Sequence, residues 1–360
     1  MNEADWTEND RGRLRRSLID ATPPSPTSSP MHRLGSAVAR RDTEALRRIS
    51  AAPTPLGRLR LALARAEAGL ALLADDPGWS ATDRRRLIAA DVLARPSRVD
   101  GRGATPFLFD QAIPIVEARV NGDARGYFIV DTGAPHTALS KRWCAANGVA
   151  LHGGVVHGVD DDAGNEIAAV TARLRSIAVG AVAVDVPAIA FDFPAGLDVA
   201  GILSPLDVFA GEAVTLDYAA RRLAIGGDAS TASGVPLFWE GGVPLMPARV
   251  GGIDAMMLFD TGAGGEVLCA RFAERFRTDH LLAATTRTAA GTVPVRLGLI
   301  QPLQIGGAAA IETRFAVKPC VATGSDTALI GCDGMIGGTW MAGRRLTIDA
   351  DRLTLRFDGA

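Results

Sequence analysis

The chain has 360 residues, of which 48% are hydrophobic and 22% are charged, and its formal net charge at pH 7 is −2. This balance is typical of a folded protein with a sizeable core and excludes a chain that is disordered throughout. A net charge so close to zero gives no general reason to expect nucleic acid or an anionic membrane surface as a partner.

No segment has the pattern of a membrane span. The most apolar stretch, residues 177–203, is interrupted by Asp185, Pro187, Asp192 and Pro194. The N-terminus carries arginines without an apolar segment behind them, which is not the pattern of a secretory signal. We therefore expect a cytoplasmic protein, or a periplasmic one if the true start lies upstream.

The first hundred residues divide into two zones. Residues 1–30 contain "ATPPSPTSSP", which cannot bury a core, and we expect this zone to be disordered. Residues 31–100 have a helical pattern. In this zone "DTEALRRIS" opens with an aspartate N-cap, and "SATDRRRLIAADVLA" begins at Ser80 or Thr82 and stops before Pro96. The zone predicts a small helical hairpin or bundle.

Charge separates this N-terminal part from the rest of the chain. Residues 1–100 carry a net charge of +4, and residues 101–360 carry −6. Attraction between the two parts could dock the helices over a site on the acidic body as an inhibitory segment, which would be intramolecular regulation. A stabilising or partner-binding helical module is the alternative.

The remaining sequence contains a long internal repeat. "IPIVEARVNGDARGYFIVDTGAPHTALS" in the first half is matched by "VPLMPARVGGIDAMMLFDTGAGGEVLC" in the second. Further along, "AVTLDYAARRLAI" is matched by "RLTIDADRLTLRF". Matching parts in matching order indicate two copies of one β-rich unit. We expect lobe 1 at 105–227, a linker at 228–236 and lobe 2 at 237–360.

Each copy places Asp-Thr-Gly-Ala directly after an apolar run, with the aspartates at Asp131 and Asp260. Together with the repeat around it, this pattern resembles the aspartic proteases of the retropepsin and pepsin clan, over roughly residues 105–360. The resemblance implies a mainly β fold with two pseudo-symmetric, retropepsin-like β-barrel lobes in one chain, here preceded by a small α-helical region. A lone Asp-Thr-Gly would more simply be a turn after a strand.

The chemistry of the family explains why two aspartates are needed. Hydrolysis of a peptide bond by water requires a base for the water and an acid for the amide. Two neighbouring carboxyl groups that share one proton, as in aspartic proteases, supply both. The resemblance therefore makes Asp131 and Asp260 the catalytic pair. It gives supporting roles in the active-site loops to Thr132, Gly133, Ala134, Thr261, Gly262 and Ala263.

Two segments could form flaps over a cleft between the lobes. In lobe 1, "HGVDDDAGNEIAAV" is a polar, glycine-bounded turn that includes Gly158, Asp160 and Gly164. In lobe 2, "TRTAAGTVPV", with Gly291, has the corresponding place. We expect both to be hairpins that can move over a substrate.

Two positions near the motifs set this chain apart. Lobe 2 keeps the apolar-apolar-glycine step of the family as Met335-Ile336-Gly337, whereas lobe 1 has Ser204 in place of that glycine. His136 follows Asp131 by five residues and could line the cleft, although a packed or surface histidine is the simpler interpretation.

The four cysteines have neither the CxxC spacing nor the Cys/His spacing of a metal site. We expect free thiols, with a Cys320–Cys332 pair as the alternative in an exported protein. No metal and no organic cofactor are implied.

These observations predict an aspartic-type endopeptidase, a hydrolase whose substrate is an extended peptide or protein segment. The competing hypothesis is a peptide-binding protein that keeps the two-lobed cleft with weak or no catalysis.

Overall fold

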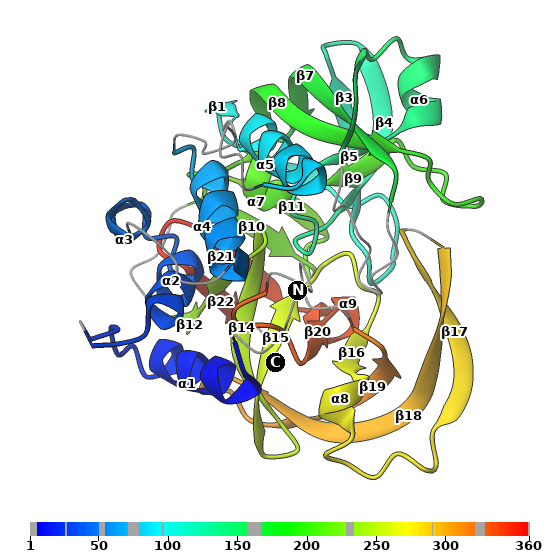
Figure 1. The fold of residues 1–360 in the computed structure, drawn as a ribbon. Coiled ribbons are helices and arrows are strands. Elements are labelled where there is room, and N and C mark those ends of the chain that lie inside the picture. The colour runs from blue at the N-terminus through cyan, green and yellow to red at the C-terminus, as the bar shows by residue number, and fades with distance from the viewer. Residues whose placement is uncertain are drawn as a thin grey trace.

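The computed structural model describes residues 6–25, 27–49, 55–70, 79–94, 97–156, 167–227, 234–289, 291–320 and 328–358. In this part of the chain the protein is mainly β, with one lobe above the other and helices along one side (Figure 1). The expected fold class is confirmed: two β lobes in one chain follow a small helical region. No helix among the described residues is long and apolar enough to cross a bilayer.

The helices that precede the lobes are α1 (Glu8–Ile19), α2 (Pro30–Ala39), α3 (Thr43–Arg48), α4 (Pro55–Glu67) and α5 (Ala81–Leu93). Four of them, α1, α2, α3 and α5, begin at a side chain that caps them. The side chain of Asp42 accepts the N–H of Ala45, and Ser80, rather than Thr82, accepts the N–H of Asp83.

The expectation that residues 1–30 are disordered is wrong for α1. Thr7 begins this helix in a reciprocal capping box with Asp10. Trp6, Leu14 and Leu18 are buried, and the indole N–H of Trp6 donates to a carbonyl oxygen of lobe 2 at 2.8 Å. Trp6 has its hydrogen-bond partner 323 positions along the chain, and Leu14 and Leu18 join a cluster formed by α2 and lobe 2, so local composition could not indicate the helix.

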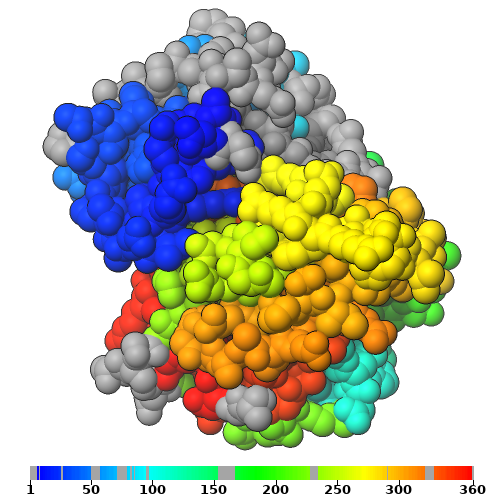
Figure 2. Space-filling model, turned by 90° about the horizontal axis from the view of Figure 1, so that it is seen from below, coloured from blue at the N-terminus to red at the C-terminus, as the bar shows by residue number. Residues whose placement is uncertain are grey.

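Helices α1 to α4 pack against one face of lobe 2, and Figure 2 shows the first of them beside that lobe from below. Arg15 donates to the carbonyl oxygen of Ile330 and to the carboxylate of Asp333, both at 2.9 Å. α5 lies against lobe 1 instead, where Leu93 joins a cluster with Phe191. The cluster on lobe 2 includes Trp6, Leu14, Leu18, Met31 and Leu34 from the helices and Phe238, Leu245, Leu258 and Met335 from the sheet.

Lobe 1 is built on an eight-stranded sheet in which β4 (Ala124–Val130) lies between β3 (Ile115–Val120) and β9 (Gly201–Leu203). β4 and β9 are parallel, and their ends carry the first Asp-Thr-Gly turn and the start of α7 (Pro205–Val208). The other strands are β1 (Arg98–Asp100), β5 (Ala138–Ser140), β6 (Leu151–Val156), β7 (Ala169–Val179) and β8 (Ala181–Phe191); α6 (Lys141–Ala146) follows β5.

Lobe 2 repeats this arrangement in a second eight-stranded sheet. Here β15 (Ile253–Phe259) is antiparallel to β14 (Val243–Val250) and parallel to β20 (Gly334–Ile336), and α9 (Gly338–Met341) follows β20. The other strands are β13 (Phe238–Glu240), β16 (Glu266–Cys269), β17 (Leu282–Thr288), β18 (Gly291–Ile305) and β19 (Ile311–Lys318); α8 (Ala270–Ala273) follows β16.

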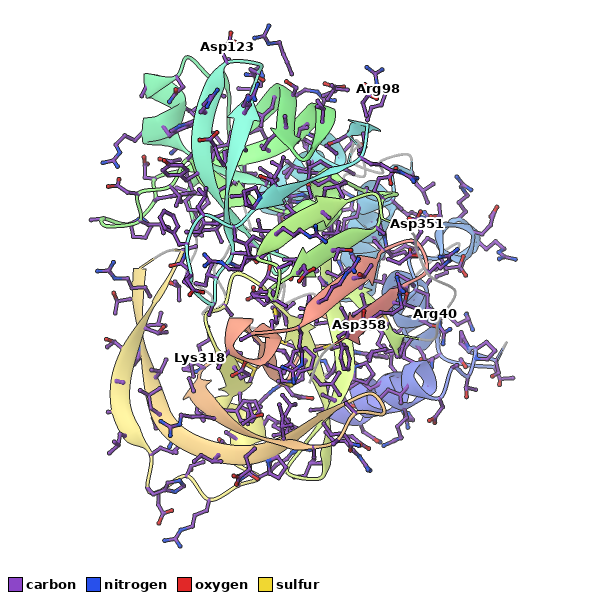
Figure 3. The ribbon with its side chains drawn as sticks, turned by 180° about the vertical axis from the view of Figure 1, so that it is seen from behind. Arg40, Arg98, Asp123, Lys318, Asp351 and Asp358 are labelled. Atoms are coloured by element: carbon purple, nitrogen blue, oxygen red, sulfur yellow. A yellow bond between two sulfur atoms is a disulfide. The ribbon has the colours of Figure 1, made fainter. Side chains whose placement is uncertain are left out.

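A third, six-stranded sheet joins the two halves, and Figure 3 shows its strands side by side from behind. At its centre β10 (Val214–Asp217) is antiparallel to β21 (Arg345–Asp349), and the hydroxyls of Thr215 and Thr347 lie 3.0 Å apart. The remaining strands are β2 (Gly103–Pro106), β11 (Arg222–Ile225), β12 (Val235–Pro236) and β22 (Thr354–Asp358). β12 lies within the expected linker, of which 228–233 are outside the described residues.

The expectation of free thiols is wrong for two of the four cysteines. Cys269 and Cys320 form a disulfide with a Cα–Cα distance of 5.0 Å, whereas Cys144 and Cys332 are free and buried. β16 and β19 are parallel neighbours, and Cys269 pairs in register with Lys318. This places Cys320 just beyond the end of the partner strand, a proximity that a separation of 51 residues conceals.

Candidate active site

The two Asp-Thr-Gly-Ala turns are held in the same way at the ends of corresponding strands. The backbone N–H of Asp131 donates to the carbonyl oxygen of Leu203 at 2.9 Å, and that of Asp260 donates to Ile336 at 3.0 Å. Each aspartate thus extends the parallel pairing of β4 with β9 or of β15 with β20 by one residue.

Each carboxylate accepts two hydrogen bonds from its own turn. In lobe 1 Oδ1 of Asp131 lies 2.7 Å from the backbone nitrogen of Gly133 and 3.1 Å from that of Ala134. In lobe 2 the corresponding distances from Asp260 are 2.8 Å to Gly262 and 3.1 Å to Ala263. These N–H groups orient both carboxylates, and the match between the lobes is within 0.1 Å.

The two turns also lock onto each other. The hydroxyl of Thr132 donates to the carbonyl oxygen of Phe259 at 2.7 Å, and the hydroxyl of Thr261 donates to that of Val130 at 2.7 Å. Both threonines are buried. The lobes are therefore joined directly beneath the aspartates.

Each carboxylate lies against the glycine of the opposite turn. A Cβ atom on Gly133 would be 2.6 Å from Cγ of Asp260, and one on Gly262 would be 2.4 Å from Cγ of Asp131. No side chain fits at either position, because such distances are far below van der Waals contact. The fold therefore brings together all eight residues that the sequence placed in the two active-site loops.

The family model described as "Aspartyl protease" matches residues 116–204 and 246–338, which together make up just over half of the chain. The chain belongs to the aspartyl protease family. Among solved structures, the crystal structure of the aspartic proteinase from Irpex lacteus is similar at 13% sequence identity and a TM-score of 0.44. The similarity covers 72% of this chain and 98% of that chain. No curated protein is similar enough to count as a match.

One of the two segments expected to form flaps is a hairpin in this aspartyl protease, and its role as a flap stays a prediction. β17 and β18 pair up to Thr288 and Gly291, and the hairpin extends from lobe 2 toward lobe 1 (Figure 1). Near its tip Ala289 packs against a lobe 1 cluster that contains Phe191. A Cβ atom on Gly196 of lobe 1 would lie 3.1 Å from Nη1 of Arg287. The other expected flap, with Gly158, Asp160 and Gly164, lies outside the described residues.

Tyr218 is a buried residue that the sequence did not single out. Burial raises the pKa of its phenol, and the charges of Asp260 and Asp131 raise that pKa further. Its hydroxyl donates to Sδ of Met341 at 3.3 Å. Tyr218 follows β10 in the joining sheet, far along the chain from either motif, and nothing in "LDYAA" marks it.

Ser204 and His136 both lie beside the first turn. The Ser204 hydroxyl donates to the carbonyl oxygen of Ala134 at 2.7 Å, and Nδ1 of His136 lies 3.5 Å from Oδ2 of Asp207 in α7. Burial lowers the pKa of His136, but Asp207, with a smaller contribution from Glu67 of α4, outweighs this, so that the net shift is upward. A role for His136 in the cleft stays a prediction.

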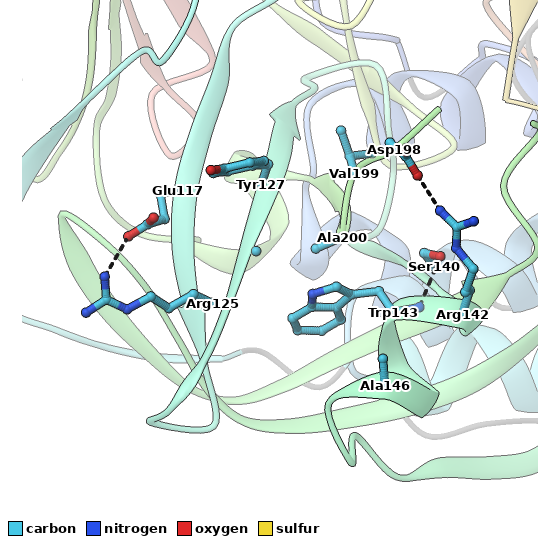
Figure 4. A pocket seen from close by; sticks show the side chains of 11 residues that line it. Glu117, Arg125, Tyr127, Ser140, Arg142, Trp143, Ala146, Asp198, Val199 and Ala200 are labelled. Carbon is cyan, nitrogen blue, oxygen red and sulfur yellow. Dashed lines mark hydrogen bonds and ion pairs between the residues drawn. The ribbon is translucent and has the colours of Figure 1, made fainter. Parts of the chain in front are cut away.

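A separate hollow of about 440 Å³ lies on lobe 1 (Figure 4). It is lined by Tyr127 and Trp143 and edged by two ion pairs, Glu117 with Arg125 and Asp198 with Arg142. Neither aspartate and no residue of the two turns lines it, so it is distinct from the candidate active site. Among the described residues, no group of His, Cys, Asp and Glu side chains is arranged to hold a metal ion.

Proposed function

We propose that the protein is an aspartic-type endopeptidase in which Asp131 and Asp260 activate a water molecule to hydrolyse extended peptides. The observation that carries this proposal is the position of each carboxylate against the glycine of the opposite turn. An acid and a base must act on one water and one peptide bond, so their carboxyl groups must lie within reach of both. The two matched turns supply such a pair.

The pair works with one proton between its two carboxyl groups, because neighbouring carboxylates do not both ionise readily. The ionised member removes a proton from the water, whose oxygen bonds to the carbonyl carbon of the peptide. The protonated member gives its proton to the carbonyl oxygen, and a neutral tetrahedral diol results. The carboxyl group that took the proton from water then gives it to the amide nitrogen, while the other carboxylate takes a proton from a diol hydroxyl. The C–N bond breaks, a carboxylic acid and an amine leave, and the pair again holds one proton.

The supporting residues have separate tasks in this proposal. The N–H groups at Gly133, Ala134, Gly262 and Ala263 orient the carboxylates, and Thr132 and Thr261 fix the distance between the lobes. The lobes, proposed at 105–227 and 237–360, would hold an extended substrate between them. The β17–β18 hairpin would cover it, and its backbone could pair with the peptide as an added strand.

A peptide-binding protein with weak or no catalysis is the second candidate, since the same cleft can bind without cutting. The two functions separate in one experiment. The protein is incubated with a diverse peptide mixture, with and without pepstatin, and new termini are identified by mass spectrometry. Pepstatin-sensitive new termini within the peptides support the endopeptidase. Peptides that stay bound to the protein and uncut support the binding protein.

The aspartates are tested by Asp131→Asn and Asp260→Asn, which nearly preserve shape and remove one carboxyl group. We expect each variant to lose cleavage by several orders of magnitude while its thermal unfolding stays close to that of the wild type. Near-native turnover in either variant would refute the shared-proton pair.

A further inference from the structure

The chain behind the two aspartate turns differs between the lobes at one step. After β20, lobe 2 continues as Gly337-Gly338, whereas after β9 lobe 1 continues as Ser204-Pro205. Both pairs start a short helix, α7 or α9 (both labelled in Figure 1), directly after the residue whose carbonyl oxygen accepts the N–H of the aspartate. The two pairs therefore lie at corresponding positions behind the aspartate turns but offer different hydrogen-bond donors.

In lobe 2 a backbone N–H group holds the carbonyl oxygen of the aspartate turn. The N–H of Gly338 donates to the carbonyl oxygen of Ala263 at 2.8 Å, and the N–H of Ala263 in turn donates to Asp260 at 3.1 Å. Gly337 leaves no room for a side chain, because a Cβ atom there would lie 2.7 Å from the carbonyl oxygen of Ala263.

Lobe 1 cannot use the same bond, because Pro205 has no N–H. The carbonyl oxygen of Ala134, which corresponds to Ala263, instead accepts the hydroxyl of Ser204 at 2.7 Å. Ser204 is only 2% exposed, and its own N–H donates to the hydroxyl of Thr137 at 3.1 Å.

The simpler explanation of a Ser-Pro pair is a helix start, with serine as the N-cap and proline in the first turn. Ser204 does occupy the N-cap of α7, yet its side chain makes no capping hydrogen bond. Its hydroxyl is directed at the aspartate turn instead. The serine is therefore explained by the turn and not by the helix.

We propose that Ser204 is a positioning residue: its hydroxyl replaces the N–H that Pro205 lacks and holds the Ala134 carbonyl, which keeps the Ala134 N–H directed at Asp131. The inference rests on the proposed function of Asp131. It also makes positions 204 and 205 interdependent, since serine is required only because proline follows it.

The test uses the full-length chain with Ser204→Gly, Pro205→Gly, and both changes together. The single Ser204→Gly variant leaves the Ala134 carbonyl without a donor, and we expect kcat to fall about tenfold, which corresponds to the loss of one buried hydrogen bond. KM should stay within about twofold, because the bond acts on the carboxylate and not on substrate binding. The double variant regains an N–H at position 205 and should recover most of the lost kcat.

Two results would overturn the proposal: an unchanged kcat in Ser204→Gly, or a double variant no faster than Ser204→Gly. Pro205→Gly alone keeps the serine hydroxyl and should stay near wild-type activity, which controls for added backbone freedom. If the wild type cleaves nothing, the proposed function fails separately. Amide hydrogen exchange of residues 131–140 then still tests whether Ser204 holds the aspartate turn. We expect faster exchange in Ser204→Gly and restored protection in the double variant.

Discussion

Thr132 and Thr261 hold each other across the boundary between the lobes. The backbone N–H of Thr132 donates to the hydroxyl of Thr261 at 3.0 Å, and the N–H of Thr261 donates to the hydroxyl of Thr132 at 3.1 Å. Each hydroxyl also donates to a carbonyl oxygen of the opposite strand. These hydrogen bonds thus make each turn depend on the other lobe.

We expect Thr132→Val to lower both stability and activity, because valine keeps the shape of threonine but removes the hydroxyl. The N–H of Thr261 and the carbonyl of Phe259 lose a partner in a buried site, at a cost of about 1–3 kcal/mol for each group. Urea unfolding and peptide cleavage measure the two effects. Thr132→Ser keeps the hydroxyl and is the matched control; equal behaviour of the two variants would contradict this role.

The glycines that contact the opposite carboxylate allow a second prediction. Gly133→Ala or Gly262→Ala would place a methyl group where the other lobe has its aspartate. We expect kcat/KM to fall about a hundredfold or more, because small displacements of catalytic groups have effects of this size. Gly307→Ala is the control, since a Cβ atom there has open space. Activity that survives at positions 133 and 262 would show that the aspartates are not so closely apposed.

We expect the N-terminal helices to stabilise the folded protein. Leu14 is fully buried and Ile19, in the same helix, is 41% exposed. We expect Leu14→Ala to cost about 2–5 kcal/mol of unfolding free energy and Ile19→Ala far less.

Removal of residues 1–100 should give a protein that aggregates, because it uncovers the apolar face of lobe 2. A soluble chain that begins at Gly101 and is more active than the full chain would favour the inhibitory role instead.

The upward shift of the His136 pKa gives a stability that depends on pH. A pKa raised in the folded state means that folding favours the charged imidazole. The contribution of His136 to the free energy of unfolding is fully present below its unfolded pKa of about 6.5. It is lost as pH rises through the pKa of His136 in the folded protein. Urea unfolding of His136→Gln should therefore show a larger destabilisation at about pH 5 than at about pH 9. His280→Gln, at a solvent-exposed site, is the control, and a pH-independent effect at His136 would contradict the pairing with Asp207.

The disulfide can be checked by alkylation under denaturing, non-reducing conditions. We expect label on Cys144 and Cys332 only, and on all four cysteines after reduction. Replacing Cys269 and Cys320 together by serine should lower the free energy of unfolding by about 2–4 kcal/mol. Four labelled cysteines without reductant would show that the pair is open in the purified protein.

The repeated motifs made it possible to predict the two-lobed fold, because a pattern that occurs twice in the same order indicates a shared tertiary structure, which a single motif does not. The two strands ending in Asp-Thr-Gly, the lobe 2 hairpin and the strand pairs after Val214 and Arg345 could all be read in chain order. The position of Cys320 beside Cys269, the effect of the two aspartate charges on the pKa of Tyr218 and the packing of Trp6 on lobe 2 could not. Each depends on a pairing between distant segments that leaves no local pattern.

The joining sheet has a consequence for how the chain is made. The edge of β10 that pairs with β21 has no partner until residues 345–349 exist, so a nascent lobe 1 presents an open strand while the second half is synthesised. Exposed edges of this kind recruit other strands. We therefore expect lobe 1 expressed alone to aggregate, and the wild-type chain to acquire cleavage activity only after the last strand pair has closed.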